Sequence, residues 1–256
     1  MNFKKVTTAY SFDMGISSSR LEYYRRVLSQ YLEPLMPGYT EFFTNVNRLR
    51  LLSWLLKRYF QSTQGKVLNV GCGAFAAEML LSSLDKHEIT SFDYTNHFAI
   101  LYDQFRQDGY LTNTHFFVGD ARLVELPENS FALIIMNDIL YEMDLDFESM
   151  LEKYSTFLRP GGLLIFDVLD IRTRWLWKLL GREAAYRRYD RVAVISLLSS
   201  KSLDCLECLP ALGNKGSLDK LFRRVLWYGF GLSNNFTFLV KKKRASLNGK
   251  SISHHT

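Results

Sequence analysis

Two glycines and an aspartate are spaced as a nucleotide site requires. Gly71 and Gly73 follow a short apolar run, residues 67–70, which has the pattern of a buried strand that ends in a tight turn. Asp93 ends the next apolar run, 20 residues after Gly73. Glycines let a ligand approach the backbone closely, and one carboxylate can accept hydrogen bonds from both ribose hydroxyls. The spacing therefore predicts a ribose-binding carboxylate beside a glycine loop, with a helix N-cap as the alternative role of Asp93.

A second set of reactive side chains follows the apolar run 131–136. Asp138 and Glu142 offer carboxylates that could remove a proton from a substrate, although Glu142 equally fits a solvated carboxylate at a helix start. Tyr10, in the N-terminal segment, could close over the same pocket, as could Tyr23 and Tyr24, for which helix packing is the simpler interpretation. We expect these groups at the sheet edge where the glycine loop begins.

A sheet is needed to bring these residues together, and the chain carries the pattern of one. From Lys66 onward, short apolar runs alternate with stretches of helical periodicity. The predicted strands are 67–70, 88–92, 115–118, 131–136 and 163–168, and the predicted helices are 21–35, 42–60, 75–84, 98–107 and 147–158. Such alternation predicts an α/β, doubly wound, mostly parallel sheet. Two further runs, 223–230 and 235–240, are joined by four residues and predict an antiparallel C-terminal hairpin, which makes seven strands.

Three additions surround this domain, which we place at residues 65–243. Residues 1–64 form an N-terminal helical segment or lid, and residues 244–256 form a flexible tail. An insert of about 50 residues at 169–220 separates strands five and six, far above the ~2–6 residues of an ordinary connection. We expect substrate recognition in this insert.

Charge is divided unevenly among these parts, although the whole chain carries a net +6. Residues 1–64 hold 9 Lys and Arg against 4 Asp and Glu, residues 171–191 hold 7 against 2, and residues 65–170 hold 6 against 17. We predict that the two basic parts roof a substrate pocket, with aromatic residues that exclude water and arginines that attract an anion or a membrane surface. The candidates are Tyr10, Trp175, Trp177, Arg172, Arg174 and Arg188. Amphipathic packing is the alternative role of the insert.

Five ordered motifs over roughly residues 66–243 resemble those of class I S-adenosylmethionine-dependent methyltransferases. They are V-L-N-V-G-C-G at 67–73, Asp93 as the second-strand acid, V-G-D-A at 118–121, L-P-E-N-S-F at 126–131 and L-R-P-G-G-L-L at 158–164. The resemblance implies S-adenosylmethionine as cofactor, with its ribose on Asp93, its adenine near Asp120 and Ala121, and Asp138 close by. The implied cofactor contacts are Asn69, Gly71, Cys72, Gly73, Asp93, Tyr94, Asp120, Ala121 and Asn137.

Three positions depart from the family pattern. Asn69 stands where the family usually has an acid, Phe75 where many members have a third glycine, and Glu142 where relatives often carry His. Asn69 can still accept a hydrogen bond, but it lacks the charge that helps an acid to bind the cofactor's ammonium group, worth about 1 kcal/mol or more. Phe75 is tolerated if its ring points into the core or lies over the adenosine.

The resemblance favours methyl transfer to a small or medium organic acceptor, anionic or lipid-like, with the acceptor atom (O, N or C) unresolved. The residues after the fourth strand lack the N/D-P-P-Y/F motif of many enzymes that methylate amino groups of nucleic acids and proteins. Two alternatives stay open. The fold could bind S-adenosylmethionine and catalyse another reaction, such as a cyclisation, or the chain could be a non-catalytic partner subunit.

Composition restricts the remaining classes of partner and location. With 47% hydrophobic residues and no apolar run near the ~18–20 residues that span a bilayer, and no signal-peptide pattern, we expect a cytoplasmic protein. Scattered basic residues without an RNA-binding motif argue against a nucleic-acid partner, while peripheral membrane contact stays open. Cys205 and Cys208 form a lone C-x-x-C, so no metal is predicted and two thiols on a helix or turn are expected. The oligomeric state is not specified.

Overall fold

The computed structural model describes residues 17–82, 87–179, 186–210, 225–226 and 229–244. Within them the strands are β1 (Lys66–Val70), β2 (Ile89–Asp93), β3 (Thr114–Val118), β4 (Phe131–Met136), β5 (Leu158–Leu169), β6 (Leu203–Pro210) and β7 (Asn235–Lys242). The α-helices are α1 (Ser18–Tyr31), α2 (Tyr39–Phe43), α3 (Val46–Leu55), α4 (Ala76–Leu81), α5 (Ala99–Gln107), α6 (Phe147–Phe157), α7 (Arg174–Leu179) and α8 (Arg191–Ser200). Shorter helical turns are η1 (Leu56–Phe60), η3 (Asn96–Phe98) and η4 (Ile171–Thr173).

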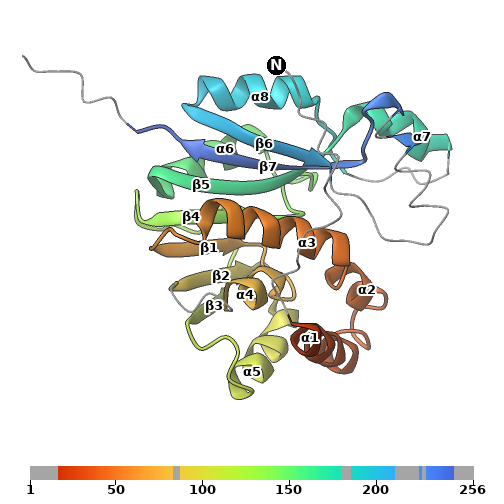
Figure 1. The fold of residues 1–256 in the computed structure, drawn as a ribbon, viewed down its shortest axis with the longest axis vertical. Helices are drawn as coiled ribbons and strands as arrows, with labels where there is room; N and C mark the ends of the chain where they lie inside the picture. Colours follow the sequence, from red (N-terminus) through yellow and green to blue (C-terminus); the bar gives the residue numbers. More distant parts are fainter. Residues whose placement is uncertain (1–16, 83–86, 180–185, 211–224, 227–228, 245–256) are drawn as a thin grey trace, which may run out of the picture.

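The strands form one sheet in the order β3-β2-β1-β4-β5-β7-β6 (Figure 1). The first five strands pair in parallel, and β7 pairs antiparallel with both β5 and β6. The predicted fold class, a doubly wound and mostly parallel seven-stranded sheet with antiparallel C-terminal strands, is confirmed.

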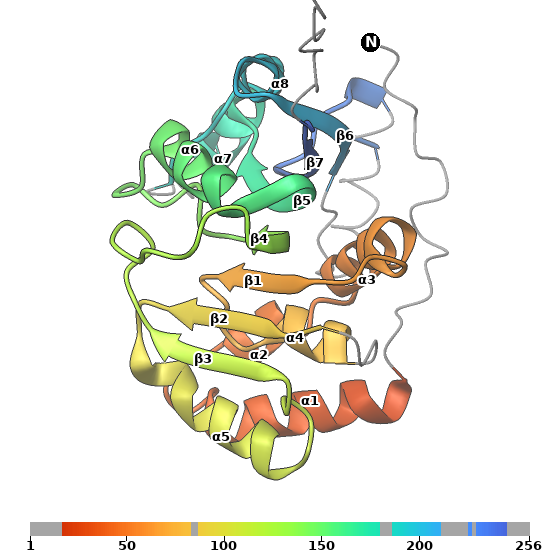
Figure 2. The ribbon, with the colours of Figure 1, turned by 90° about the vertical axis from the view of Figure 1, so that its left-hand side faces the viewer.

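Helices cover both faces of the sheet because the strand side chains alternate between two apolar cores. Val67 of β1 packs in a core shared with α1, α3, α4 and α5, whereas Leu68 packs in a core shared with α6 and α8. Figure 2 shows α3 and α6 on opposite sides of the sheet. The helices cover the two faces of the sheet but not the edge where the parallel strands end. That edge is therefore free for a ligand.

Polar side chains set where the N-terminal helices begin. Ser17 caps α1 by accepting a hydrogen bond from the backbone N–H of Arg20 at 3.2 Å. Asn45 caps α3 by accepting from Asn47 and Arg48, so the single helix predicted over 42–60 is wrong and is divided into α2, α3 and η1. The break at Asn45 lets α2 turn away from α3 and approach the glycine loop.

The sixth strand differs from the prediction. It is β6, which lies inside the predicted insert, while residues 225–226 and 229–230 are helical rather than part of a hairpin strand. Leu203 pairs with Lys242 and Pro210 with Phe236, so β6 and β7 are joined by residues 211–234. Cys205 and Cys208 lie on this strand as free thiols, not on a helix or turn. Among the described residues, no helix has the length and apolar character needed to cross a membrane.

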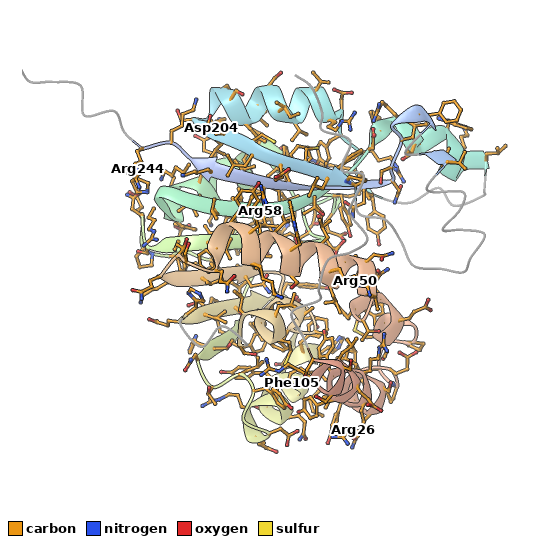
Figure 3. The ribbon with its side chains drawn as sticks, viewed as in Figure 1. Arg26, Arg50, Arg58, Phe105, Asp204 and Arg244 are labelled. Carbon is orange, nitrogen blue, oxygen red and sulfur yellow. The ribbon has the colours of Figure 1, made fainter. Side chains whose placement is uncertain are left out.

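Phe75 holds the backbone conformation that favours glycine. It has φ 62° and ψ 31°, directly before α4, and its side chain is fully buried. The ring packs against Tyr102, Phe116 and Phe105, the last of which lies between α5 and the sheet (Figure 3). Phe75 therefore points into the core and not over the adenosine site.

This geometry predicts an unusual order of stability for two variants. Phe75→Ala should destabilise the fold by about 3–5 kcal/mol, because it leaves a cavity in the core. Like the native chain, this variant keeps the left-handed φ, which costs a residue with a Cβ atom about 1–2 kcal/mol. Phe75→Gly leaves the same cavity but relieves the strain, so it should be the more stable of the two by about 1 kcal/mol. Urea unfolding measures the difference. Ala76→Gly, one residue later inside α4, is the control. It should be less stable than the native chain, because Gly in a helix is less favourable than Ala. Equal stability of the two Phe75 variants would contradict the assignment of strain.

Candidate active site

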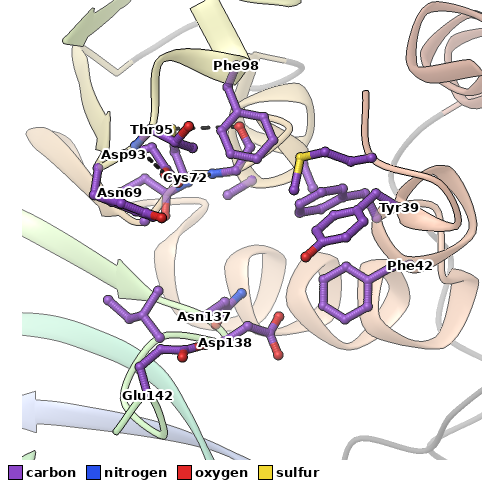
Figure 4. Close-up of a pocket in the computed structure, with 18 of the residues that line it drawn as sticks. Tyr39, Phe42, Asn69, Cys72, Asp93, Thr95, Phe98, Asn137, Asp138 and Glu142 are labelled. Carbon is purple, nitrogen blue, oxygen red and sulfur yellow. Dashed lines mark hydrogen bonds between the residues drawn. The ribbon is translucent and has the colours of Figure 1, made fainter. Parts of the chain in front are cut away.

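A cavity of about 1150 Å³ opens at the carboxyl ends of β1, β2 and β4. The glycine loop and Asp93 line one side of it, and α2 with the residues after β4 line the other (Figure 4). Pockets for one small ligand usually measure ~300–1000 Å³. The volume is therefore sufficient for a cofactor and a second small molecule.

At its two glycines, Gly71 and Gly73, the loop leaves no room for a side chain. Gly71 has φ 62° and Gly73 has φ 53°, both in the left-handed region. A Cβ atom on Gly71 would lie 2.4 Å from Cγ2 of Ile139, and one on Gly73 would lie 2.7 Å from Cε1 of Phe43. The two glycines thus allow the turn and bring the backbone to the cavity wall, as the sequence predicts.

Asp93 lies at the end of β2 with its carboxylate held toward the glycine loop. Its Oδ2 accepts a hydrogen bond from the backbone N–H of Gly73 at 3.0 Å, and its Oδ1 accepts from that of Thr95 at 3.2 Å. Burial raises the pKa of Asp93, and these backbone donors oppose the rise. The carboxylate is fixed in the cavity wall and keeps lone pairs for a ligand's hydroxyl groups.

Asp120 and Tyr94 also line the cavity, with Ala121 beside Asp120. Arg122 binds both carboxylate oxygens of Asp120, with Nη2 at 2.6 Å from Oδ2, and these bonds lower the pKa of Asp120 to about 2. Asp120 is therefore ionised at neutral pH and engaged by Arg122. The side chain of Tyr94 is exposed and stands at the rim.

Asn69 lines the cavity below the loop and is hydrogen-bonded to a buried acid, Glu78, which the sequence analysis did not single out. Its Nδ2 donates to Oε1 of Glu78 at 2.8 Å, and Ser91 Oγ donates to the same oxygen at 2.5 Å. Glu78 belongs to α4 and is fully buried. Cys72, in the loop itself, is also buried.

The residues after β4 form the floor of the cavity. Asp138 has φ 60°, a left-handed conformation that Asp tolerates better than most residues. It forms an ion pair with Arg48 of α3 and accepts a hydrogen bond from the Tyr141 hydroxyl at 2.8 Å. Asn137 lines the cavity with a buried Oδ1 that has no partner among the described residues. A strained acid and an unsatisfied amide in the floor of a cavity are typical of functional sites.

Glu142 stands in the same wall without an ion-pair partner among the described residues. Burial and the nearby Asp144 raise its pKa. Of the two carboxylates predicted to act as a base, Asp138 is engaged in an ion pair with Arg48, whereas Glu142 has no such partner among the described residues.

Aromatic residues of α2 close one side of the cavity, with Phe43 next to Gly73 of the glycine loop. Tyr39, Phe42 and Phe43 lie in mutual contact, with ring centroids 5.2–6.0 Å apart. The guanidinium of Arg48 lies 4.6 Å from the ring centroid of Phe42. Tyr39 and Phe42 face Asp138 across the cavity in Figure 4. The wall lies within residues 1–64, one of the two parts predicted to roof the pocket, but its aromatic residues were not singled out, because so short a helix has too few residues to show a period.

Residues 171–191, predicted to form part of the roof of the substrate pocket, contribute one described residue to the cavity lining. Tyr186 lines the cavity, whereas Trp175, Arg172, Arg174 and Arg188 do not. Arg172 is paired with the buried Asp170 at 2.7 Å, and Arg188 donates to Asn234 Oδ1 at 3.0 Å. These arginines join the segment to the residues just before β7. The buried carboxylate of Asp170 and the carbonyl oxygens there need hydrogen-bond donors, which the arginines supply. Trp175 is 58% exposed at the surface, and the side chain of Trp177 lies outside the described residues.

None of the three tyrosines considered as a cover for the pocket is placed over it by the described residues. Tyr10 lies outside the described residues. Tyr24 is buried and donates to the carbonyl of Ala74 at 2.9 Å, and Tyr23 stacks on Tyr110. Both belong to helix packing, and Tyr24 supports the glycine loop from behind.

Comparisons with known proteins agree with this fold. Residues 67–162 match a family model described as a methyltransferase domain. Many solved structures are similar, among them the [4+2]-cyclase SpnF, with a TM-score of 0.60 and 16% identity over 77% of this chain and 81% of that chain. Magnesium protoporphyrin IX methyltransferase from Synechocystis PCC 6803 with bound SAH has a TM-score of 0.60 and 12% identity over 88% and 95%. A SAM-dependent methyltransferase from Methanosarcina mazei has a TM-score of 0.55 and 15% identity over 75% and 98%. No curated protein matches the sequence.

The fold is that of a class I methyltransferase. Residues 67–162 match the model of a methyltransferase domain, and the resemblance predicted from the motifs is confirmed. The cofactor of this class is S-adenosylmethionine, as predicted. The residues present suit it: a loop whose close approach to its walls requires glycine, an acid placed for a ribose, and an unpartnered amide oxygen.

Proposed function

We propose that the chain transfers the methyl group of S-adenosylmethionine to a small or medium organic acceptor held between α2 and the end of β4. One observation carries the proposal: the same cavity is lined by the glycine loop and by the aromatic side chains of α2. A cofactor on the loop and an acceptor under α2 would therefore meet without crossing solvent.

When bound, the cofactor supplies an electrophilic methyl group on a sulfonium, which an acceptor attacks in line. Much of the rate can then come from positioning, because charge is dispersed rather than created in this step. Tyr39, Phe42 and Tyr141 would exclude water from the acceptor, and Asp93 would fix the ribose end. Glu142 would take the proton of an acceptor that carries one, because its raised pKa favours proton uptake and no ion pair engages it among the described residues.

Charges in the described lining favour a neutral or cationic acceptor over the anionic one expected from the sequence. Arg48 is paired with Asp138, and Arg122 is paired with Asp120 and Asp144. Glu41 and Glu142 add carboxylates to the same cavity. The described lining holds six carboxylates against three arginines, of which Arg25 has no ion pair among the described residues, so an anion would meet a wall with an excess of negative charge.

A non-methylating reaction such as a cyclisation is the second candidate. The fold is shared with the [4+2]-cyclase SpnF, and Glu142 replaces the His expected from the family pattern. In that case the cofactor would be bound but not consumed.

Incubation with methyl-labelled S-adenosylmethionine and a metabolite extract, fractionated by charge, tests the proposal. We expect label in a product from the neutral or cationic fraction. Cofactor that binds and stays intact would support the second candidate, and absence of binding would favour a non-catalytic subunit.

A further inference from the structure

Glu78 is a buried acid that stability alone does not require. It lies in α4 between the buried side chains of Ala77 and Met79, and its own side chain is fully buried. Burying a carboxylate costs several kcal/mol after relaxation, as an order of magnitude. An apolar residue would suit the position better, because the neighbouring side chains of this helix are apolar and buried.

Its hydrogen bonds leave part of that cost uncompensated. Oε1 accepts from both Asn69 Nδ2 and Ser91 Oγ, whereas Oε2 has no partner among the described residues. No described cation forms an ion pair with Glu78. Burial accordingly raises the pKa of Glu78, and the two hydrogen bonds oppose the rise. A half-satisfied buried carboxylate of this kind calls for a role beyond packing.

Glu78 lies directly behind Asn69, the residue that stands where the family usually has an acid. The family pattern places an acid at residue 69, in the cavity wall, to assist the cofactor's ammonium group. Here that position is a neutral amide, and an acid lies directly behind it within hydrogen-bonding distance. Because Nδ2 of Asn69 donates to Glu78, the amide oxygen is the atom left to accept a hydrogen bond from a ligand.

We propose that Glu78 is a positioning residue that orients Asn69 and supplies, from one residue behind the cavity wall, the negative charge for the ammonium end of S-adenosylmethionine. The inference rests on the proposed function. The ammonium group would favour the ionised form of Glu78 against the burial that raises its pKa. In a buried site of low effective dielectric, a charge behind one residue still acts on a cation in the cavity. The chain thus keeps the acid of the pattern but carries it on α4 instead of β1.

A pair of ligands separates this role from a merely structural one. S-adenosylhomocysteine carries the ammonium group, whereas 5′-methylthioadenosine has the same adenosine and thioether without it. Glu78→Gln preserves the shape and an acceptor oxygen but removes the charge. We expect its calorimetric Kd for S-adenosylhomocysteine to rise about tenfold, the loss of one charge-assisted contact, with the Kd for 5′-methylthioadenosine unchanged within about twofold.

The reciprocal variant provides the rescue. Asn69→Asp combined with Glu78→Gln restores an acid–amide pair with the acid in the cavity wall, and should bind S-adenosylhomocysteine at least as tightly as the native chain. Equal losses for both ligands in Glu78→Gln, or no loss for either, would overturn the inference, as would failure of the double variant to recover. If the native chain bound neither ligand, the cofactor site of the proposed function would itself be refuted.

Discussion

Asp93→Ala should weaken the binding of S-adenosylhomocysteine by about 10²-fold or more. Two ribose hydroxyls would lose a charged acceptor, and hydrogen bonds to charged groups contribute about 1.5–3 kcal/mol each. The structure strengthens this expectation, because backbone N–H groups of Gly73 and Thr95 fix the carboxylate in the cavity wall. Calorimetric titration of the native and variant chains measures the loss.

The same backbone bonds make a control necessary. Asp93→Ala also removes an acceptor for the N–H of Gly73, so a loosened glycine loop could weaken binding without any ribose contact. A cofactor analogue that lacks one ribose hydroxyl completes a double-mutant cycle. The native chain should bind the deoxy analogue more weakly than the parent compound, and Asp93→Ala should bind the two alike. If the variant discriminated as strongly as the native chain, the ribose would lie elsewhere.

The glycine loop and Asp93 were predictable because their signals are local. An apolar run, a glycine turn and an acid after the next run lie within 27 residues, and parallel strands bring their carboxyl ends to one edge. Glu78 was not selected, although the sequence held a signal for it. A single acid among Ala77, Met79 and Leu80 is unusual on a helix, but the partner Asn69 becomes evident when strand and helix are packed.

The acceptor side of the site was predicted less well because charge counts do not reveal pairing. Residues 171–191 are basic, yet Arg172 and Arg188 are engaged by Asp170 and by groups near β7. The aromatic wall comes from α2, within the predicted N-terminal part of the roof, and its approach to the loop depends on the helix break at Asn45. The sixth strand was misplaced for a related reason: a short link between two apolar runs favours a hairpin locally, whereas the sheet pairs β7 with the more distant β6.

The largest expected effect on turnover is that of Glu142→Gln. Loss of a general base usually lowers the rate by about 10²–10⁴-fold, and we expect kcat for a proton-bearing acceptor to fall within that range. The Kd for S-adenosylhomocysteine should stay the same, because Glu142 lies in the floor beyond the loop. Native-like turnover in this variant would exclude Glu142 as the base.

The pH dependence gives this assignment a sharper test. A base acts when deprotonated, so kcat should decline as the pH falls through the pKa of Glu142, which burial and Asp144 hold above its ordinary value. Asp144→Asn removes one of those causes and should move the acidic limb of the pH profile to lower pH, with the plateau rate nearly unchanged. Asp146→Asn is the matched control, since Asp146 caps α6 and does not contribute to the raised pKa of Glu142. A limb that stayed in place in Asp144→Asn, or moved equally in Asp146→Asn, would assign the titration to another group.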